Sequence, residues 1–382
     1  MLHFSDTEFT RRREALCAVM REEELDAMLL FAQESMYWLT GYDTFGYCFF
    51  QCLAITADGK MSLLTRSADL RQARHTSNIE NIVIWTDSGN ANPAIDLRNM
   101  LDDMDLLGSK IGVEYDTHGL TAANGKKVDE ALDRFGELHD ASVLVPRLRR
   151  VKSAEEIAHI EKAAEMADLA YDEALALTRA GADEGDILAA MQGAVFKAGG
   201  DYAGNEFIIG SGEDALLCRY KAGRRKLSDN DQMTLEWAGA SAHYHVAMMR
   251  TLIVGKPKPE HQHHFDAAKE ALLACEEAMR PGKTFGDVFE AHAAVMDHNG
   301  LARHRLNACG YGLGARYSPC WMDGPMFYQG NETLIQPDMC LFAHMIIMDS
   351  TSGTAMCLGH SYMTTDDAPR ALSRHGLDFI CL

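Results

Sequence analysis

The pattern of predicted helices and strands changes near residue 150, and this change limits the possible folds of the chain more than any other feature. Upstream of it, short apolar segments alternate with charged, amphipathic helical stretches and are separated by Gly/Asp turns. The upstream strands are predicted at residues 27–31, 54–56, 60–65, 82–85 and 110–114, after a first helix at residues 9–24. Alternation of this kind is typical of an α/β domain in which helices flank a sheet.

Downstream of residue 150, long helices are followed by runs of strands, which is typical of an α+β domain. Ser153 and Glu156 form the capping-box pattern that opens a long helix to about residue 179. The other downstream elements are predicted as helices at residues 181–200 and 264–279 and as strands at residues 207–210, 233–238, 250–254 and 346–349. A chain of 382 residues exceeds the usual size of one domain, so we predict one domain over residues 1–152 and a second over residues 153–382.

Charge and composition argue against several classes of partner. The net charge is −20, which disfavours binding to nucleic acid or to an anionic membrane. No apolar run approaches the roughly 20 residues of a membrane span, and the first residues lack the pattern of a signal peptide. The ten cysteines include no C-x-x-C pair, as expected for reduced thiols. We therefore expect a cytoplasmic protein that binds neither nucleic acid nor a membrane.

Glu236 is the side chain of the downstream domain that is hardest to explain by packing. It lies between Leu235 and Trp237 in a predicted strand, and burying a carboxylate is costly unless the group is paired or protonated. One interpretation makes Glu236 the ion-pair partner of Arg250. The other makes it a general base or a nucleophile whose pKa is raised by burial.

Several motifs of this chain resemble, in the same order, those of the superfamily of creatinases, prolidases and methionine aminopeptidases (peptidase M24). They are residues 150–157, the turn at 210–215, Arg250-Thr251, Gly310-Tyr-Gly-Leu-Gly314 and 334–337 downstream, and residues 37–43 upstream. The resemblance covers nearly the whole chain. It implies a creatinase-type α/β N-terminal domain followed by a C-terminal domain with the pita-bread fold, and an α+β class for the protein.

The resemblance also implies that the metal site of this superfamily has been lost. Its five ligand positions correspond to Glu236, Ala247, Tyr311, Gln336 and Gly359. Only Glu236 is an anionic ligand, and one carboxylate cannot hold a dinuclear site, which needs bridging carboxylates and an imidazole. We therefore expect no metal and no cofactor.

Within the superfamily, the metal-free ectoine hydrolases resemble this chain in further motifs. These are residues 38–43 with Gln51-Cys52, 199–202, 236–251, and 317–321 with 336–339. There are two departures: residues 218–220 stand where these relatives have a histidine, and residues 358–360 stand where they keep a carboxylate. The resemblance implies a metal-independent, homodimeric hydrolase that cleaves a non-peptide C–N bond of a small polar nitrogen compound, such as a cyclic amidine or a ureido compound.

The implied catalytic residues are Glu236, His245 and Tyr311. Glu236 would activate water or attack the substrate, His245 would move the proton, and Tyr311 would stabilise developing charge. Arg219 would bind a substrate carboxylate, and its alternative role is an ion pair within its own loop. The further candidates for substrate contact are His243, Arg250, Tyr317, Trp321, His360 and Trp38.

These candidates also have structural alternatives, and two other functions stay open. His243 and His245 would share one face of a strand; as a metal pair they lack further ligands, so they either contact substrate or are satisfied within the fold. The aromatic candidates are also typical core residues. The other functions are a metal-dependent Xaa-Pro dipeptidase and a non-catalytic binding protein of the same superfamily, the latter favoured by the lost histidine and carboxylate.

Overall fold

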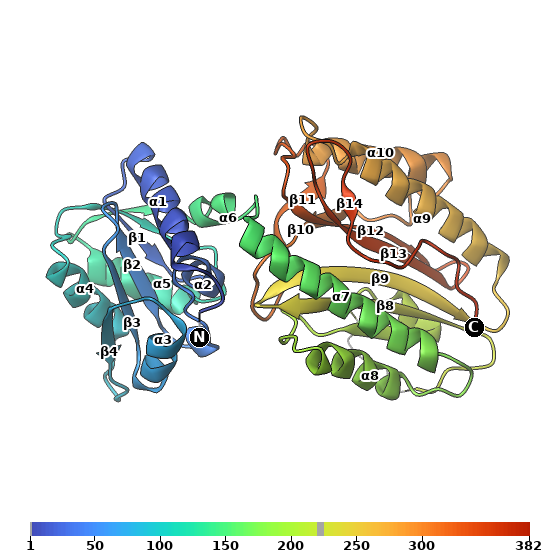
Figure 1. Ribbon diagram of the computed structural model, residues 1–382, viewed down its shortest axis with the longest axis horizontal. Helices are drawn as coiled ribbons and strands as arrows, with labels where there is room; N and C mark the ends of the chain where they lie inside the picture. Colours follow the sequence, from blue (N-terminus) through green and yellow to red (C-terminus); the bar gives the residue numbers. More distant parts are fainter. Residues whose placement is uncertain (1, 220–224) are drawn as a thin grey trace. The chain divides into compact units, whose positions relative to one another are not determined.

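The computed structural model describes residues 2–219 and 225–382 of the chain. The chain forms two compact units, Met1–Arg149 and Arg150–Leu382, whose helices and strands are labelled in Figure 1. The division therefore falls between Arg149 and Arg150, and the prediction from sequence places it after residue 152.

The N-terminal unit is built on a six-stranded mixed sheet in the order β4-β3-β2-β1-β5-β6. Its strands are β1 (Ala27–Leu30), β2 (Cys52–Thr56), β3 (Met61–Arg66), β4 (Asn81–Trp85), β5 (Lys110–Val113) and β6 (Glu137–Asp140). Its helices are α1 (Asp6–Glu22), α2 (Gln33–Thr40), α3 (Leu70–Thr76), α4 (Pro93–Asp103), α5 (Ala122–Leu132) and α6 (Leu144–Leu148), with short 3-10 helices η1 (Gly46–Cys48) and η2 (Ser67–Asp69).

The central strand β1 shows that this sheet is covered on both faces. Its residues alternate between two separate apolar clusters: Ala27 and Leu29 belong to one, and Met28 and Leu30 belong to the other. Because successive side chains of a strand point to opposite faces, each cluster fills one side of the sheet. The prediction of an α/β arrangement for this part of the chain is confirmed.

The C-terminal unit contains an eight-stranded sheet in the order β11-β10-β12-β13-β9-β8-β7, with β14 beside β13. Its strands are β7 (Ile208–Ser211), β8 (Asp231–Ser241), β9 (Tyr244–Val254), β10 (Ala308–Gly312), β11 (Asp323–Tyr328), β12 (Cys340–Asp349), β13 (Thr354–Met363) and β14 (Arg370–Ala371). Its helices are α7 (Ala154–Leu177), α8 (Glu184–Lys197), α9 (Pro259–Ala278) and α10 (Phe285–His298), with the 3-10 helix η3 (Gly212–Leu216).

Helix α7 lies directly on strands β8 and β9, as Figure 1 shows. The helix begins at the predicted capping box, with Ser153 as its N-cap. Its approach to β8 requires glycine at position 239, because a Cβ atom on Gly239 would lie 1.9 Å from the Ala163 carbonyl oxygen. Two residues away, the Trp237 Nε1–H donates to the Ala167 carbonyl oxygen at 2.8 Å. Backbone contact and a buried indole therefore hold the helix and the strand together.

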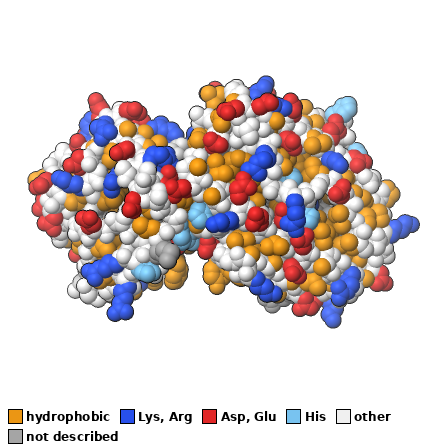
Figure 2. Space-filling model, in the orientation of Figure 1, with side chains coloured by type: hydrophobic (Ala, Val, Ile, Leu, Met, Phe, Trp, Pro, Cys, Tyr) orange, Lys and Arg blue, Asp and Glu red, His pale blue; other side chains and the backbone are white. Residues whose placement is uncertain are grey.

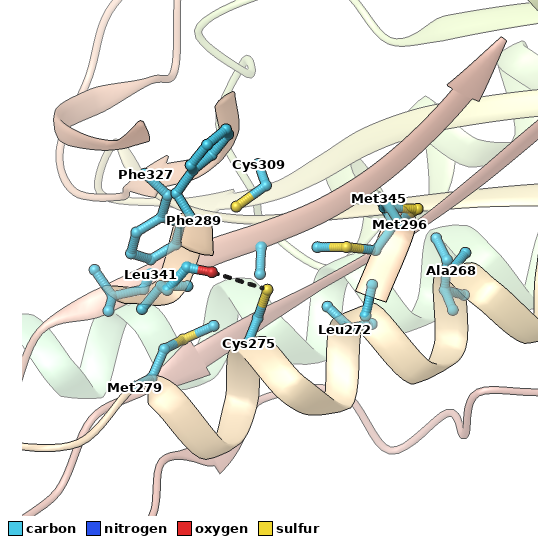
Figure 3. Packing of buried hydrophobic residues seen from close by; sticks show 14 of the residues in the cluster. Ala268, Leu272, Cys275, Met279, Phe289, Met296, Cys309, Phe327, Leu341 and Met345 are labelled. Carbon is cyan, nitrogen blue, oxygen red and sulfur yellow. Dashed lines mark hydrogen bonds between the residues drawn. The ribbon is translucent and has the colours of Figure 1, made fainter. Parts of the chain in front are cut away.

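Helix α9 covers β12 and β13 on the same side of the sheet as α7. Its residues Ala268, Leu272 and Cys275 belong to one apolar cluster with Met345 of β12, and Figure 3 shows this packing. The Cys275 thiol donates to the Val288 carbonyl oxygen of α10 at 3.6 Å. Because β13 pairs with β9, the side chains of the β13 residues in this cluster point to the side of the sheet that α7 covers.

The C-terminal sheet therefore has two different faces. The face that carries Trp237 and Leu358 is packed against α7 and α9, and we call it the helix-covered face. Glu236 precedes Trp237 on β8, so its side chain points to the opposite face. We call this opposite face the Glu236 face.

Some elements differ from those predicted. Helix α9 begins at Pro259 and not near residue 264, since proline suits the first position of a helix. The strand predicted at residues 346–349 is the end of the longer β12. The sequence pattern predicts neither α10 nor β10 and β11, and the two glycines of β10 are unfavourable in a strand.

The surface of each unit mixes side chains of different kinds. On the side shown in Figure 2, acidic and basic side chains are interspersed, so the net charge of −20 is not gathered there in a single patch. Apolar side chains lie among them, as on most protein surfaces. In the part of the chain that the structure describes, no helix combines the length and the apolar composition that a membrane crossing requires.

Candidate active site

The register of five neighbouring strands gathers the candidate site on the Glu236 face. Glu236 on β8 pairs with Met249 on β9, Met249 pairs with Gly359 on β13, and Gly359 pairs with His344 on β12. Tyr311 on β10 pairs with the residue two positions before His344. Directly opposite residues of paired strands point to the same face, so these side chains share one surface of the sheet.

A short chain of hydrogen bonds ends at the Glu236 carboxyl group. The Trp321 Nε1–H donates to the Tyr311 hydroxyl oxygen at 2.9 Å, and the Tyr311 hydroxyl donates to Glu236 Oε1 at 3.5 Å. All three side chains are buried. Because the indole can only donate, the tyrosine oxygen accepts there and its own proton is left for the carboxyl group.

Burial gives Glu236 an unusual pKa. Loss of solvent raises the pKa of this carboxyl group to about 7, against the opposing effects of the Arg219 charge and of the Tyr311 hydrogen bond. Both the acid and the carboxylate are therefore populated near neutral pH. A buried carboxyl group in this state is suited to exchange protons with a substrate.

Arg219 is exposed and follows η3, close enough to the site for its charge to lower the pKa of Glu236. Arg219→Gln is therefore expected to raise the pKa of Glu236 above 7. If the reaction needs the carboxylate, the acid limb of the kcat/KM profile will move to higher pH and the rate at pH 7 will fall. The measurement is the pH profile of the variant, with Arg303→Gln, at another exposed arginine, as the control. An acid limb that does not move would show that Arg219 has no electrostatic effect on catalysis.

His245 has its ring nitrogens engaged by the main chain, which does not fit the predicted role in proton transfer. The Gly204 N–H donates to Nε2 at 2.8 Å, and Nδ1 lies 3.4 Å from the Gly314 carbonyl oxygen. These contacts fit the neutral tautomer with its proton on Nδ1. Burial lowers the pKa of His245 to about 4. The residue therefore connects two loops, which is the structural alternative.

His243 does not share a strand face with His245, because it lies in the tight turn that joins β8 to β9. Ala242 and His243 have positive φ angles of 48° and 64°. The His243 ring stacks on the Tyr317 ring with centroids 4.1 Å apart. The turn lies six residues beyond Glu236 along β8, roughly 20 Å at the rise of a strand. The predicted substrate contacts His243 and Tyr317 are thus brought together with each other and not with Glu236.

Arg250 and His360 lie on the helix-covered face, so the register does not bring these two predicted substrate contacts together with Glu236. Arg250 pairs with Leu358 in the register, one position away from the residues that share the Glu236 face. Its guanidinium group donates to the Gly359 carbonyl oxygen at 2.5 Å and lies over the Tyr171 ring of α7. The alternative interpretation of Glu236 as the ion-pair partner of Arg250 is excluded by the same geometry.

Trp38 lies in the core of the N-terminal unit and not at a pocket surface. It is 1% exposed and packs in the cluster that includes Leu16, Met20 and Leu30. Its surroundings in this unit are apolar core side chains, so the structure does not bring Trp38 together with the other predicted site residues. Tyr220, in the motif where relatives have a histidine, lies outside the described residues.

One of the five ligand positions inferred from sequence lies outside the strands that form the Glu236 face. Gln336 is exposed in the connection before β12, whereas the residue between Tyr311 and Gly359 on the Glu236 face is His344. His344 is not among the site residues predicted from sequence, although a lone histidine within the apolar run of β12 is a recognisable signal.

The donor set on the Glu236 face does not fit a pair of divalent ions. It offers one carboxylate and one imidazole, and the remaining positions hold Ala247, Tyr311 and Gly359. A dinuclear site needs bridging carboxylates. Within residues 2–219 and 225–382, no three His, Cys, Asp or Glu side chains are grouped in a way that could hold a metal ion.

A cavity of about 300 Å³ opens beside Ala238, two residues from Glu236 on β8. Its walls come from α8, from the segment 201–207 and from the loop after β10, and include Phe196, Asn205 and Ser318. The Asn205 side-chain oxygen accepts from the backbone N–H of Trp321 at 3.3 Å. The cavity is of a size for a small molecule and is joined through this contact to the residue that orients Tyr311.

Comparison with known proteins identifies relatives of both units. The model of metallopeptidase family M24 matches residues 158–366, and the model of the creatinase/prolidase N-terminal domain matches residues 12–151. The ectoine hydrolase of Halomonas elongata is 25% identical over 360 residues, covering 88% of each chain. A protein of Sinorhizobium fredii described as an uncharacterized hydrolase/peptidase is 26% identical over 332 residues, covering 84% of each chain.

Solved structures show the same two-domain fold. The recombinant prolidase from Thermococcus sibiricus has a TM-score of 0.88 at 19% identity, over 99% of this chain and 100% of that chain. The Xaa-Pro dipeptidase from Bacillus anthracis has a TM-score of 0.85 at 20% identity, over 98% and 100%. At these identities the likeness establishes the fold, a creatinase-type N-terminal domain followed by a pita-bread domain. Because the M24 model matches more than half of the residues, the chain belongs to metallopeptidase family M24.

Proposed function

We propose that this protein is a hydrolase that cleaves a non-peptide C–N bond of a small polar nitrogen compound, such as a cyclic amidine or a ureido compound, without a bound metal ion. The observation that carries the proposal is the buried carboxyl group of Glu236, which has a pKa near 7 and shares its face with Tyr311. The relationship to an ectoine hydrolase supports this class of substrate.

In the proposed reaction, the Glu236 carboxylate takes a proton from water as the water oxygen bonds to the substrate carbon. The C–N bond then breaks and the carboxylic acid returns the proton to the departing nitrogen, so one water is consumed and the protein is unchanged. A carboxyl group with a pKa of about 7 is suited to both steps near neutral pH. Direct attack of the carboxylate on the carbon, followed by hydrolysis of the adduct, is the alternative use of the same residue.

Tyr311 would stabilise charge that develops during the reaction. The hydrogen bond from Trp321 fixes its oxygen and strengthens its hydroxyl group as a donor. A substrate held against Glu236 lies within reach of this hydroxyl, since the Tyr311 hydroxyl oxygen and Glu236 Oε1 are 3.5 Å apart. Arg219 would attract a carboxylate group of the substrate.

A metal-dependent Xaa-Pro dipeptidase is the rival function, because prolidases share the fold. Its chemistry requires side chains that hold metal ions and polarise a peptide carbonyl. The alanine at position 247 and the glycine at position 359 remove such side chains from the Glu236 face. The donor set therefore favours the metal-independent reaction.

Removal of divalent metals is expected to leave the activity unchanged. The test compares protein before and after dialysis against EDTA, with elemental analysis of both samples, on cyclic amidines, ureido compounds and Xaa-Pro dipeptides. Hydrolysis of a compound of the first two classes at equal rates would support the proposal. Dipeptide hydrolysis that is lost with EDTA and restored by Mn²⁺ would establish the rival. Binding of a compound without turnover would establish a non-catalytic binding protein.

The proposal includes a homodimer in the cytoplasm with a small molecule as its substrate and with neither nucleic acid nor membrane as a partner. The homodimer follows from the resemblance to creatinase-type enzymes. The ten cysteines are all unpaired, which is compatible with a reducing compartment.

A further inference from the structure

A buried histidine on the Glu236 face has no role in the reaction described above. His344 lies on β12 and is 8% exposed. The register of β12 with β13 and β10 turns it to the Glu236 face. Its ring centroid lies 5.6 Å from that of Tyr311 and 5.5 Å from that of Phe342. Its position is thus set by the main chain and by two aromatic neighbours, one of which contacts Glu236.

The Nδ1 atom of the His344 ring is buried and has no hydrogen-bond partner among the residues that the structure describes. Buried polar atoms in native proteins are nearly always satisfied, so an exception calls for an explanation. The ring packs against Tyr311 on the Glu236 face, so a partner that arrives with a ligand is the direct explanation.

The charge state of His344 decides what it can recognise. Burial lowers its pKa to about 3, and the nearby His292 and Arg219 act in the same direction. The ring is therefore neutral at working pH and has one nitrogen that accepts a hydrogen bond. A neutral ring does not repel a cationic ligand, whereas a positively charged imidazolium ion would repel it.

We propose that His344 is a specificity-determining residue that accepts a hydrogen bond from one N–H group of the substrate while Glu236 accepts one from another. The inference rests on the proposed function and deepens it. Glu236 and His344 both lie against Tyr311, so together they fit a compound with two N–H groups, such as an amidine, a guanidine or a urea. A tertiary amide or an ester has no such donor and would leave both acceptors unpaired, which discriminates strongly against it.

The probe that tests this inference is acetamidinium chloride, with tetramethylammonium chloride as a cation of the same charge that has no N–H group. Affinities are measured by calorimetric titration of the full-length protein. The wild-type protein is expected to bind acetamidinium more tightly than tetramethylammonium. His344→Phe keeps an aromatic ring against Tyr311 and Phe342 but removes the nitrogen, so it is expected to weaken acetamidinium binding by about 10- to 100-fold, as for a hydrogen bond to a charged group. His344→Gln restores an acceptor and is expected to recover part of the affinity.

His360→Phe is the matched control. His360 is also buried, has an unsatisfied Nε2 atom and has a pKa that burial lowers to about 3, but it lies on the helix-covered face. Its replacement is expected to leave acetamidinium binding unchanged. Thermal unfolding of each variant shows that it is folded, and His344→Met takes the place of His344→Phe if the latter does not fold.

Two results would overturn the inference: wild-type protein with no preference for acetamidinium, or His344→Phe with wild-type affinity. Because binding is measured without turnover, failure of the inference and failure of the proposed function are distinguishable. A protein that hydrolyses a C–N bond while His344→Phe binds acetamidinium normally would refute only the role of His344. A protein that shows the expected affinities but no hydrolysis would refute only the proposed function.

Discussion

Replacing Glu236 with glutamine is expected to lower kcat by about 10²- to 10⁴-fold, the range for loss of a general base. Glutamine keeps the shape of the side chain and can still accept from the Tyr311 hydroxyl, so the fold is expected to remain intact. It can neither take a proton from water nor attack a carbon atom. A loss beyond this range would favour the nucleophilic role over the general-base role.

The matched control for this experiment is Glu114→Gln. Glu114 is a second buried carboxyl group whose pKa burial raises to about 7, but it lies in the N-terminal unit. There it accepts from the backbone N–H groups of Phe31 and Ala32 and from the Ser35 hydroxyl. The same substitution at this site is expected to leave kcat near the wild-type value. Equal losses in both variants, or a wild-type rate in Glu236→Gln, would remove Glu236 from the mechanism.

The same residue is expected to make the protein less stable as the pH rises. The fold favours the protonated form of Glu236, because burial raises its pKa from the ordinary value of 4.5 to about 7. The stability that this preference contributes is fully present below about pH 4.5 and is lost as the pH rises through about 7. The pKa difference corresponds to a free energy on the order of 3 kcal/mol. Glu236→Gln has no proton to lose at this position. Its free energy of unfolding is therefore expected to rise by this amount relative to that of the wild type between pH 4.5 and pH 8.

Urea unfolding of the two proteins at several pH values measures this difference. Glu114 and every other titrating group are present in both proteins, so their contributions cancel when the free energies of unfolding are subtracted. A difference between the two proteins that is constant from pH 4.5 to pH 8 would mean that the Glu236 pKa is not raised in the folded state. The two experiments on Glu236 together separate its ionisation from its role in turnover.

Helix α7 and strand β8 could be predicted because their signals are local. The capping box of Ser153 and Glu156 needs only neighbouring residues. Strand β10 could not be predicted, because its Cys309-Gly-Tyr-Gly sequence has little strand preference and the strand is held by pairing with β11 and β12. Pairing between distant segments can override local preference.

Which side chains meet in the site depends on register, and this is where the sequence-based assignments fail. Arg250 follows Met249 and His360 follows Gly359, so each differs by one position from a residue on the Glu236 face. A difference of one residue moves a side chain to the other side of a sheet. The tight turn at His243 breaks the alternation that its neighbours follow. Motif spacing alone therefore cannot distinguish the two faces.

The backbone contacts of His245 have a mechanical consequence for the site. Nε2 accepts from Gly204, in a segment that lines the cavity, and Nδ1 contacts the carbonyl of Gly314, in the loop that leads to Trp321. One imidazole ring therefore couples the cavity wall to the loop whose indole orients Tyr311. The two segments move as a unit or the ring loses a hydrogen bond. Because the pKa of His245 is about 4, this coupling persists at neutral pH, and acid strong enough to protonate Nε2 would let the cavity wall and Tyr311 move independently.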